Sequence, residues 1–83
     1  MTKQPSVKKF FRTKRGRKIS IEINDEHITF YNINGSTLYW LLTSDWIEDK
    51  TEGTGCKSNW HNHMMDKHWF TTEMMMFINN NTK

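Results

Sequence analysis

The sequence predicts an α+β fold in which a small antiparallel β-meander of three to four strands packs against one C-terminal helix. Three observations predict it: an alternating apolar pattern in residues 18–24, an Asn-Gly pair between two β-rich runs, and an apolar stripe at helical spacing near the C-terminus. The chain of 83 residues is expected to form a single domain. Because so short a chain closes only a small core, self-association as a homo-oligomer or a partner is expected to contribute to its stability.

The first part of the chain is expected to begin disordered and to continue as a hairpin. Residues 1–6 are polar, contain a proline and are predicted to be disordered. Residues 7–13 are predicted as an edge strand and residues 14–17 as its turn, with Gly16 at positive φ. Residues 18–24 alternate isoleucine with polar side chains, which is typical of a half-buried strand. Together residues 7–18 therefore form a basic arm or hairpin.

Two further strands are predicted on either side of Asn34-Gly35. Residues 27–33 and 36–43 are rich in β-branched and aromatic side chains. Asn-Gly between such runs favours a two-residue type I′ turn, in which both residues have positive φ. Alternation divides the last strand into two sets, with Leu38, Trp40 and Leu42 on one face and Tyr39 and Leu41 on the other. The meander is thus expected to have one strongly apolar face.

The C-terminal half is predicted to be mainly helical. Ser44 is expected to cap one helical turn over residues 44–49, and residues 51–55 to form a loop. Ser58 is then expected to cap a helix that runs to Asn79. The stripe that would cover the sheet consists of Trp60, Met64, Phe70, Met74, Met75 and Ile78. A second stripe consists of Met65, Trp69 and Met76, and it indicates either a helix break at Thr71-Thr72 or contact with another subunit.

Charge is distributed very unevenly along the chain. Eight of the 12 Lys and Arg residues lie in residues 1–18, which contain no acid, and all nine Asp and Glu residues follow. The net charge of +3 is therefore made of a +8 arm and a −5 body. A basic segment this concentrated predicts a polyanion as partner.

The basic arm predicts RNA as that polyanion. Lys and Arg contact phosphates, and phenylalanines set among them stack on unpaired bases. RNA is favoured over DNA because the sequence has no helix-turn-helix, zinc-finger or basic-zipper pattern. The candidate nucleic-acid-binding residues are Lys8, Lys9, Phe10, Phe11, Arg12, Lys14, Arg15, Arg17 and Lys18. The alternatives are a solvated basic tail, an arm that binds acidic protein, and an anchor to an anionic membrane surface.

A metal site is not expected, although Cys56, His61, His63 and His68 lie close together in the sequence. On a continuous helix His61 and His68 are about 10.5 Å apart along the axis, too far to ligate one ion. A metal site would require the helix to begin after His63. We expect neither a cofactor nor an enzyme, and the remaining catalytic alternative is a small nuclease that uses His and Lys as general acid and base.

The compartment follows from the cysteine count and the apolar pattern. A single cysteine excludes an internal disulfide framework and fits a reducing cytosol. Apolar runs stay well below the ~20 residues of a membrane span. The protein is therefore predicted to be cytoplasmic, with no membrane partner.

Aromatic side chains are numerous for so small a core. Tyr31, Tyr39, Trp46 and Trp69 are not all expected to be buried, and some should form an interaction surface. This predicts an alternative function: a protein–protein inhibitor or adaptor that uses an exposed aromatic and Met surface without nucleic acid.

The chain resembles the small accessory proteins of T-even-like bacteriophages in its Asn-, Lys- and Ile-rich usage, its many Trp and Met residues, and its tail Asn79-Asn80-Asn81-Thr82-Lys83. Within that group, the basic run from Lys8 to Lys18 on a compact body is similar to the ToxN-inhibitory factors (TifA). The resemblance implies an RNA-binding anti-defence protein. Such a protein inhibits the endoribonuclease toxin of a type III toxin–antitoxin system together with RNA, in the host cytoplasm. The resemblance also implies that the basic residues of this run contact the RNA.

Overall fold

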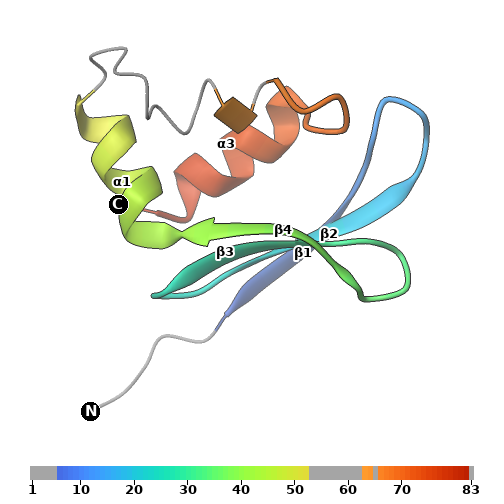
Figure 1. Ribbon diagram of the computed structural model, residues 1–83, viewed down its shortest axis with the longest axis horizontal. Helices are drawn as coiled ribbons and strands as arrows, with labels where there is room; N and C mark the ends of the chain where they lie inside the picture. Colours follow the sequence, from blue (N-terminus) through green and yellow to red (C-terminus); the bar gives the residue numbers. More distant parts are fainter. Residues whose placement is uncertain (1–5, 53–62, 65, 83) are drawn as a thin grey trace.

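The computed structural model describes residues 6–52, 63–64 and 66–82. Its elements are β1 (Val7–Arg12), β2 (Lys18–Ile23), β3 (His27–Tyr31), β4 (Thr37–Leu42), α1 (Thr43–Glu52) and α3 (Thr72–Asn80). The four strands form one antiparallel sheet in the order β1-β2-β3-β4, and both helices lie on the same side of it (Figure 1). The predicted α+β meander with a C-terminal helix is confirmed. Within the described residues, no helix is long and apolar enough to cross a bilayer.

The β1–β2 turn forms as the sequence predicts. The Thr13 amide donates to the Arg17 carbonyl at 2.8 Å, and the Gly16 amide donates to the Thr13 carbonyl at 2.9 Å. This closes a three-residue loop whose last residue, Gly16, has a φ of +84°. Glycine adopts this left-handed conformation without the steric cost that a Cβ would add.

The β3–β4 turn differs from the predicted two-residue type I′ turn. Its loop has three residues, because the Asn32 amide donates to the Ser36 carbonyl at 2.9 Å and the Gly35 amide donates to the Asn32 carbonyl at 2.9 Å. Gly35 has a φ of +89°, whereas Asn34 does not have positive φ. The Asn32 side chain decides this geometry: its Oδ1 accepts from the Asn34 and Ser36 amides at 2.8 and 2.9 Å.

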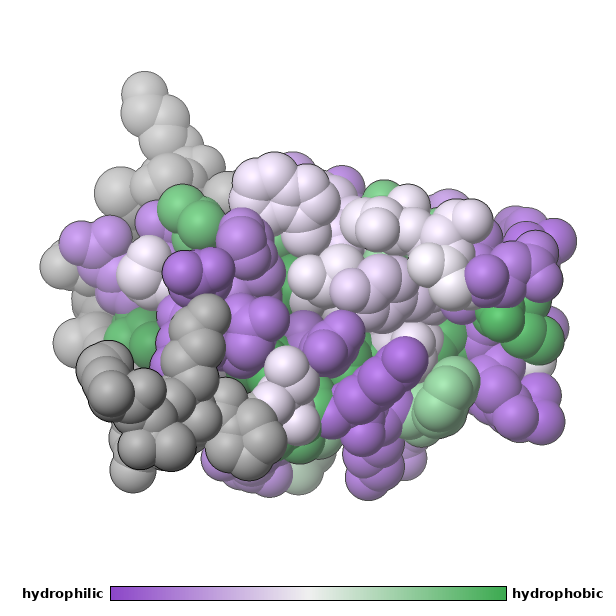
Figure 2. Space-filling view, turned by 90° about the horizontal axis from the view of Figure 1, so that it is seen from below, coloured by the Kyte–Doolittle hydropathy of each residue, from purple (hydrophilic) through white to green (hydrophobic). Residues whose placement is uncertain are grey.

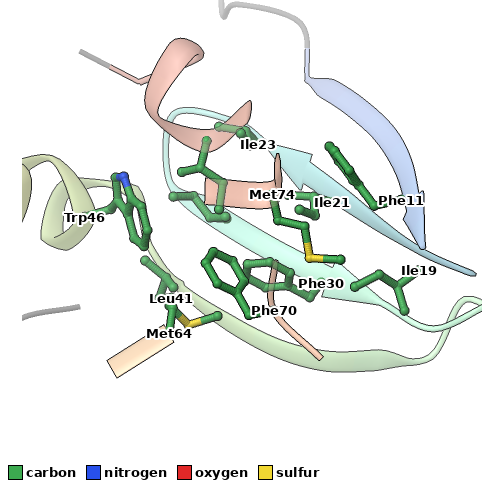
Figure 3. Packing of buried hydrophobic residues seen from close by; sticks show 12 residues of the cluster. Phe11, Ile19, Ile21, Ile23, Phe30, Leu41, Trp46, Met64, Phe70 and Met74 are labelled. Carbon is green, nitrogen blue, oxygen red and sulfur yellow. The ribbon is translucent and has the colours of Figure 1, made fainter. Parts of the chain in front are cut away.

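The hydrophobic core lies between the sheet and the helices. It consists of Phe11, Ile19, Ile21, Ile23, Ile28, Phe30, Leu41, Trp46, Met64, Phe70, Met74 and Ile78 (Figure 3). Trp46 of α1 is fully buried, and its Nε1–H donates to Oδ1 of Asn79 on α3 at 2.9 Å. The two helices are therefore joined by a hydrogen bond as well as by packing.

Helix α1 is longer than the single turn predicted over residues 44–49. It begins one residue earlier, at Thr43, and continues to Glu52, into the predicted loop. Thr43 is buried, and its hydroxyl donates to the Asn24 carbonyl at 2.8 Å. This bond ties the start of α1 to the β2–β3 turn.

The prediction of one helix up to Asn79 is wrong, because the chain is extended at Thr71, just before α3. Thr71 has φ −118° and ψ 164°, and its Oγ1 accepts from the Met74 amide at 3.3 Å as an N-cap. The predicted stripe is nevertheless buried at Met64, Phe70, Met74 and Ile78. The break at Thr71-Thr72 that the second stripe suggested is therefore the correct alternative.

Several sequence predictions lie outside the described residues. They are the disorder of residues 1–5, the end of the loop at 53–55, the cap at Ser58, and the positions of Trp60 and Met65.

The corrected helix boundary predicts different effects for two adjacent threonines. Thr71→Ala removes the cap of α3 and should lower the free energy of unfolding by about 1 kcal/mol. Thr72→Ala, at the exposed first position of the helix, is the matched control and should change it by less than about 0.5 kcal/mol. Urea denaturation followed by circular dichroism measures both. Equal effects of the two substitutions would contradict this boundary.

Candidate nucleic-acid interface

The described helices leave the opposite face of the sheet uncovered (Figure 1). Because Phe11 and Ile19 are buried beneath the helices, strand alternation places their neighbours Phe10 and Lys18 on the other side. We call this side the uncovered face. Its residues are Lys8, Phe10, Arg12, Lys18, Ser20, Glu22, His27, Thr29, Tyr31, Trp40 and Leu42.

Strand register arranges the aromatic side chains of this face in two neighbouring rows. Phe10 pairs with Ser20, and Ser20 pairs with Tyr31, so the two rings flank a small side chain. They lie two strands apart, which is about 10 Å. In the next row, Trp40 pairs with Thr29. Phe10 is 58% exposed and Trp40 is 54% exposed, so both rings offer a face to a ligand.

Basic side chains lie beside these rings. Lys8 Nζ is 5.8 Å from the centre of the Phe10 ring and 5.5 Å from that of Tyr31. Lys18 Nζ lies 5.8 Å from the Phe10 ring, and Lys18 pairs across the strands with Arg12. These distances are within the range of cation–π attraction, which holds the ammonium groups close to the rings. A ligand with both aromatic and anionic groups therefore meets both kinds of partner on one surface.

Figure 2 shows this face from below the sheet. Side chains of intermediate hydropathy gather in a band across the middle, with hydrophilic side chains on both sides of it. Trp, Tyr, Ser and Thr residues of β2, β3 and β4 supply such side chains on this face. The surface is thus neither a continuous apolar patch nor a uniformly charged one.

Glu22 is the acidic residue of the uncovered face, and it lies one row from Tyr31 across the neighbouring strand. Burial, and after it the negative charge of Glu22, raise the pKa of Tyr31 above its ordinary value of 10.0. Burial likewise raises the pKa of Tyr39 on the covered face.

The remaining basic residues of the arm lie at the β1–β2 turn. Lys14, Arg15 and Arg17 are exposed there, directly beyond Arg12 and Lys18. Arg12 Nη1 donates to the Gly16 carbonyl at 2.9 Å, which folds this guanidinium over the turn. The turn therefore extends the positive charge of the uncovered face past the end of the sheet.

Two predicted site residues lie on the other side of the sheet. Phe11 is in the core and contacts Phe77 with ring centres 5.3 Å apart. It packs and is not accessible for stacking, so Phe10 is the base-stacking candidate of the pair. Lys9 also faces the helix side, with its Nζ 5.4 Å from the Phe11 ring.

The structure adds Tyr31 and Trp40 to the candidate site, whereas the sequence predicted Tyr31 only as a candidate for an interaction surface and Trp40 for neither. Trp40 and Tyr31 share the uncovered face with Phe10, a grouping that depends on the pairing of four strands. Trp46, expected among the candidates for the surface, is fully buried. Trp69 is partly buried, with its ring centre 5.1 Å from that of Phe30.

The histidines near the C-terminus give no metal site in the described part of the chain. His63 and His68 are both exposed, and no group of three His, Cys, Asp or Glu side chains that could hold a metal ion occurs there. Cys56 and His61 lie outside the described residues.

Comparisons with protein-family models, with curated proteins and with solved structures found no match for this chain. Its function is therefore inferred from the geometry of the uncovered face.

Both tyrosines should titrate above pH 10.0 when followed by tyrosinate absorbance. Glu22→Gln should lower the pKa of Tyr31 and leave that of Tyr39 unchanged. Folding raises the pKa of each tyrosine, so the protonated tyrosine contributes its full stabilisation to the folded state at pH values below the unfolded pKa of about 10. This stabilisation is lost as the pH rises through the higher folded value. Equal shifts of both tyrosines in Glu22→Gln would contradict the Tyr31–Glu22 contact.

Proposed function

We propose that this chain is a non-enzymatic RNA-binding protein that holds single-stranded RNA against the uncovered face. One observation supports this most strongly: the rings of Phe10, Tyr31 and Trp40 share this face with Lys8, Arg12 and Lys18. Every base has a π-face that can stack on an aromatic side chain, and such stacking contributes about 1–3 kcal/mol per base. Cations beside the rings neutralise the phosphates that link those bases.

The shape of the face favours a single strand over a duplex. A duplex is read by a helix or a β-ribbon that enters a groove, whereas rings on a broad sheet face require bases that are already unstacked. Sequence-specific RNA recognition uses such unpaired bases in loops and ends. An unpaired strand is therefore the form of nucleic acid that this surface suits best.

The biological role that the sequence resemblance implies extends this proposal. In this role, the protein would be a phage anti-defence factor that acts in the host cytoplasm and, in a joint complex with RNA, inhibits a toxin endoribonuclease. RNA binding is the first step of this role.

A second candidate function is a protein–protein inhibitor or adaptor without nucleic acid. The observation that favours it is the exposure of large apolar side chains on β4: Trp40 and Leu42 on the uncovered face are 54% and 41% exposed, and Leu38 near the β3–β4 turn is 44% exposed. The ultraviolet absorbance spectrum of the purified protein distinguishes the two functions, because co-purified RNA adds a nucleotide band. Dependence of the affinity on salt does so quantitatively. Three cations of the uncovered face and three of the β1–β2 turn would contact phosphates, so the slope of log K against log[salt] should be about −4. They are Lys8, Arg12, Lys18, Lys14, Arg15 and Arg17.

Adjacent lysines on opposite faces provide a matched test of the proposed surface. Lys8→Ala removes one phosphate contact and should reduce the magnitude of the salt slope by about 0.7 for a single-stranded oligonucleotide. Lys9→Ala removes the same charge from the helix side and should leave the slope nearly unchanged. Fluorescence anisotropy with labelled oligouridylate measures both. Equal salt slopes for the two variants would contradict the proposed surface, because a lysine would then contribute equally to RNA binding from either face of the sheet.

Stacking is tested at Trp40. Trp40→Leu retains an apolar side chain but removes the ring, so the affinity for oligouridylate should fall about tenfold. Thr72→Ala is the control, because Thr72 is exposed at the start of α3, on the helix side of the sheet. Circular dichroism of both variants verifies the fold. Unchanged affinity in Trp40→Leu would contradict stacking on this face.

A further inference from the structure

A groove lies between the tips of the two hairpins and the segment with His68 and Trp69 that precedes α3, at the end of the sheet. The β1–β2 and β3–β4 turns lie at the same end of the antiparallel sheet (right in Figure 1). The groove between them has a volume of about 800 Å³, within the range of small-molecule sites. Both turns are three-residue loops that end in a glycine at positive φ, so their backbones hold the two walls of the groove in place.

The two walls of this groove have different chemistry. Arg15 and Arg17 of the β1–β2 turn supply cationic groups on one side. Ile33 and Leu38 at the β3–β4 turn, and Trp69 in the segment before α3, supply apolar surface. Ile33 is 71% exposed at a turn, where a polar residue would serve the fold equally well. Its exposed side chain therefore adds little to stability and is available to a ligand.

The groove is continuous with the proposed RNA surface. Arg12 and Lys18 belong to the uncovered face and also line the groove. A strand that leaves the sheet past the Phe10 ring therefore reaches the groove without losing contact with positive charge.

We propose that the groove binds one further nucleotide of the RNA strand, with its base against Ile33, Leu38 and Trp69 and its phosphate on Arg15 and Arg17. This inference rests on the proposed function and extends it from a flat stacking surface to a surface that ends in a nucleotide pocket. Guanidinium groups form paired hydrogen bonds with phosphate oxygens, which suits Arg at these two positions. An apolar wall suits the faces of a base, whereas it offers nothing to a bare phosphate.

The experiment follows backbone amide signals by NMR during titration with uridine monophosphate, uridine or inorganic phosphate. Gly16 and Gly35, one on each turn, are the reporters. Uridine monophosphate should shift both signals and bind about tenfold more tightly than either uridine or phosphate. Equal affinity for phosphate, or for a hexaglutamate peptide, would overturn the assignment of a nucleotide pocket.

Variants separate the two walls. Arg17→Ala should weaken uridine monophosphate about tenfold, because it removes a charge-assisted contact. Lys14→Ala, an exposed basic residue of the same turn that does not line the groove, is the control and should change the affinity little. Ile33→Ser should weaken uridine monophosphate and uridine equally. Equal losses in Arg17→Ala and Lys14→Ala would contradict the proposed phosphate contact.

Failure of this inference is distinguishable from failure of the proposed function. If oligouridylate binds with the expected dependence on Lys8 and Trp40 but uridine monophosphate does not shift Gly16, the pocket is wrong and the RNA surface stands. If oligouridylate does not bind at all, the proposed function fails first.

Discussion

The register of the β1–β2 hairpin is the constraint on which the rest of the structure depends. The three-residue loop ending at Gly16 pairs Arg12 with Lys18 and Phe11 with Ile19. A slip by one residue would move every side chain of β1 to the other face of the sheet. Phe11 would leave the core, and Phe10 would no longer lie on the uncovered face in the same row as Ser20 and Tyr31. One turn thus determines both a part of the core and a part of the candidate site.

Because the helices cover only one side of the sheet, its two faces differ. The helices bury the aliphatic residues of β2 and β3 together with Trp46, Met74 and Ile78, so few but large side chains close the core. The strands that are held in this way carry Phe10 and Trp40 on their other side, on regular backbone rather than on a loop. The rings therefore have fixed spacing, and a ligand that stacks on them does not have to order the surface first.

The sequence predicted the strands well and the surface less well, for a physical reason. Alternation and turn residues are local signals, and they were sufficient for β2 and for Gly16 at positive φ. The type I′ turn was wrong because the Asn32 side chain bonds two amides of a longer loop. The helix boundary at Thr71 depends on a cap that competes with a continuous apolar stripe. Which tryptophan is exposed depends on packing between distant segments: Trp46 is held by Asn79.

The central claim is that RNA lies on the uncovered face, and ultraviolet crosslinking tests it most directly. Single-stranded RNA irradiated in complex with the protein and analysed by mass spectrometry should give crosslinked peptides that contain Phe10, Tyr31 and Trp40. Met75, which lies on α3 and packs against the core, should not crosslink above the level of a non-binding oligonucleotide. Crosslinks concentrated on α3, with none on the three aromatic residues of the sheet, would contradict the account.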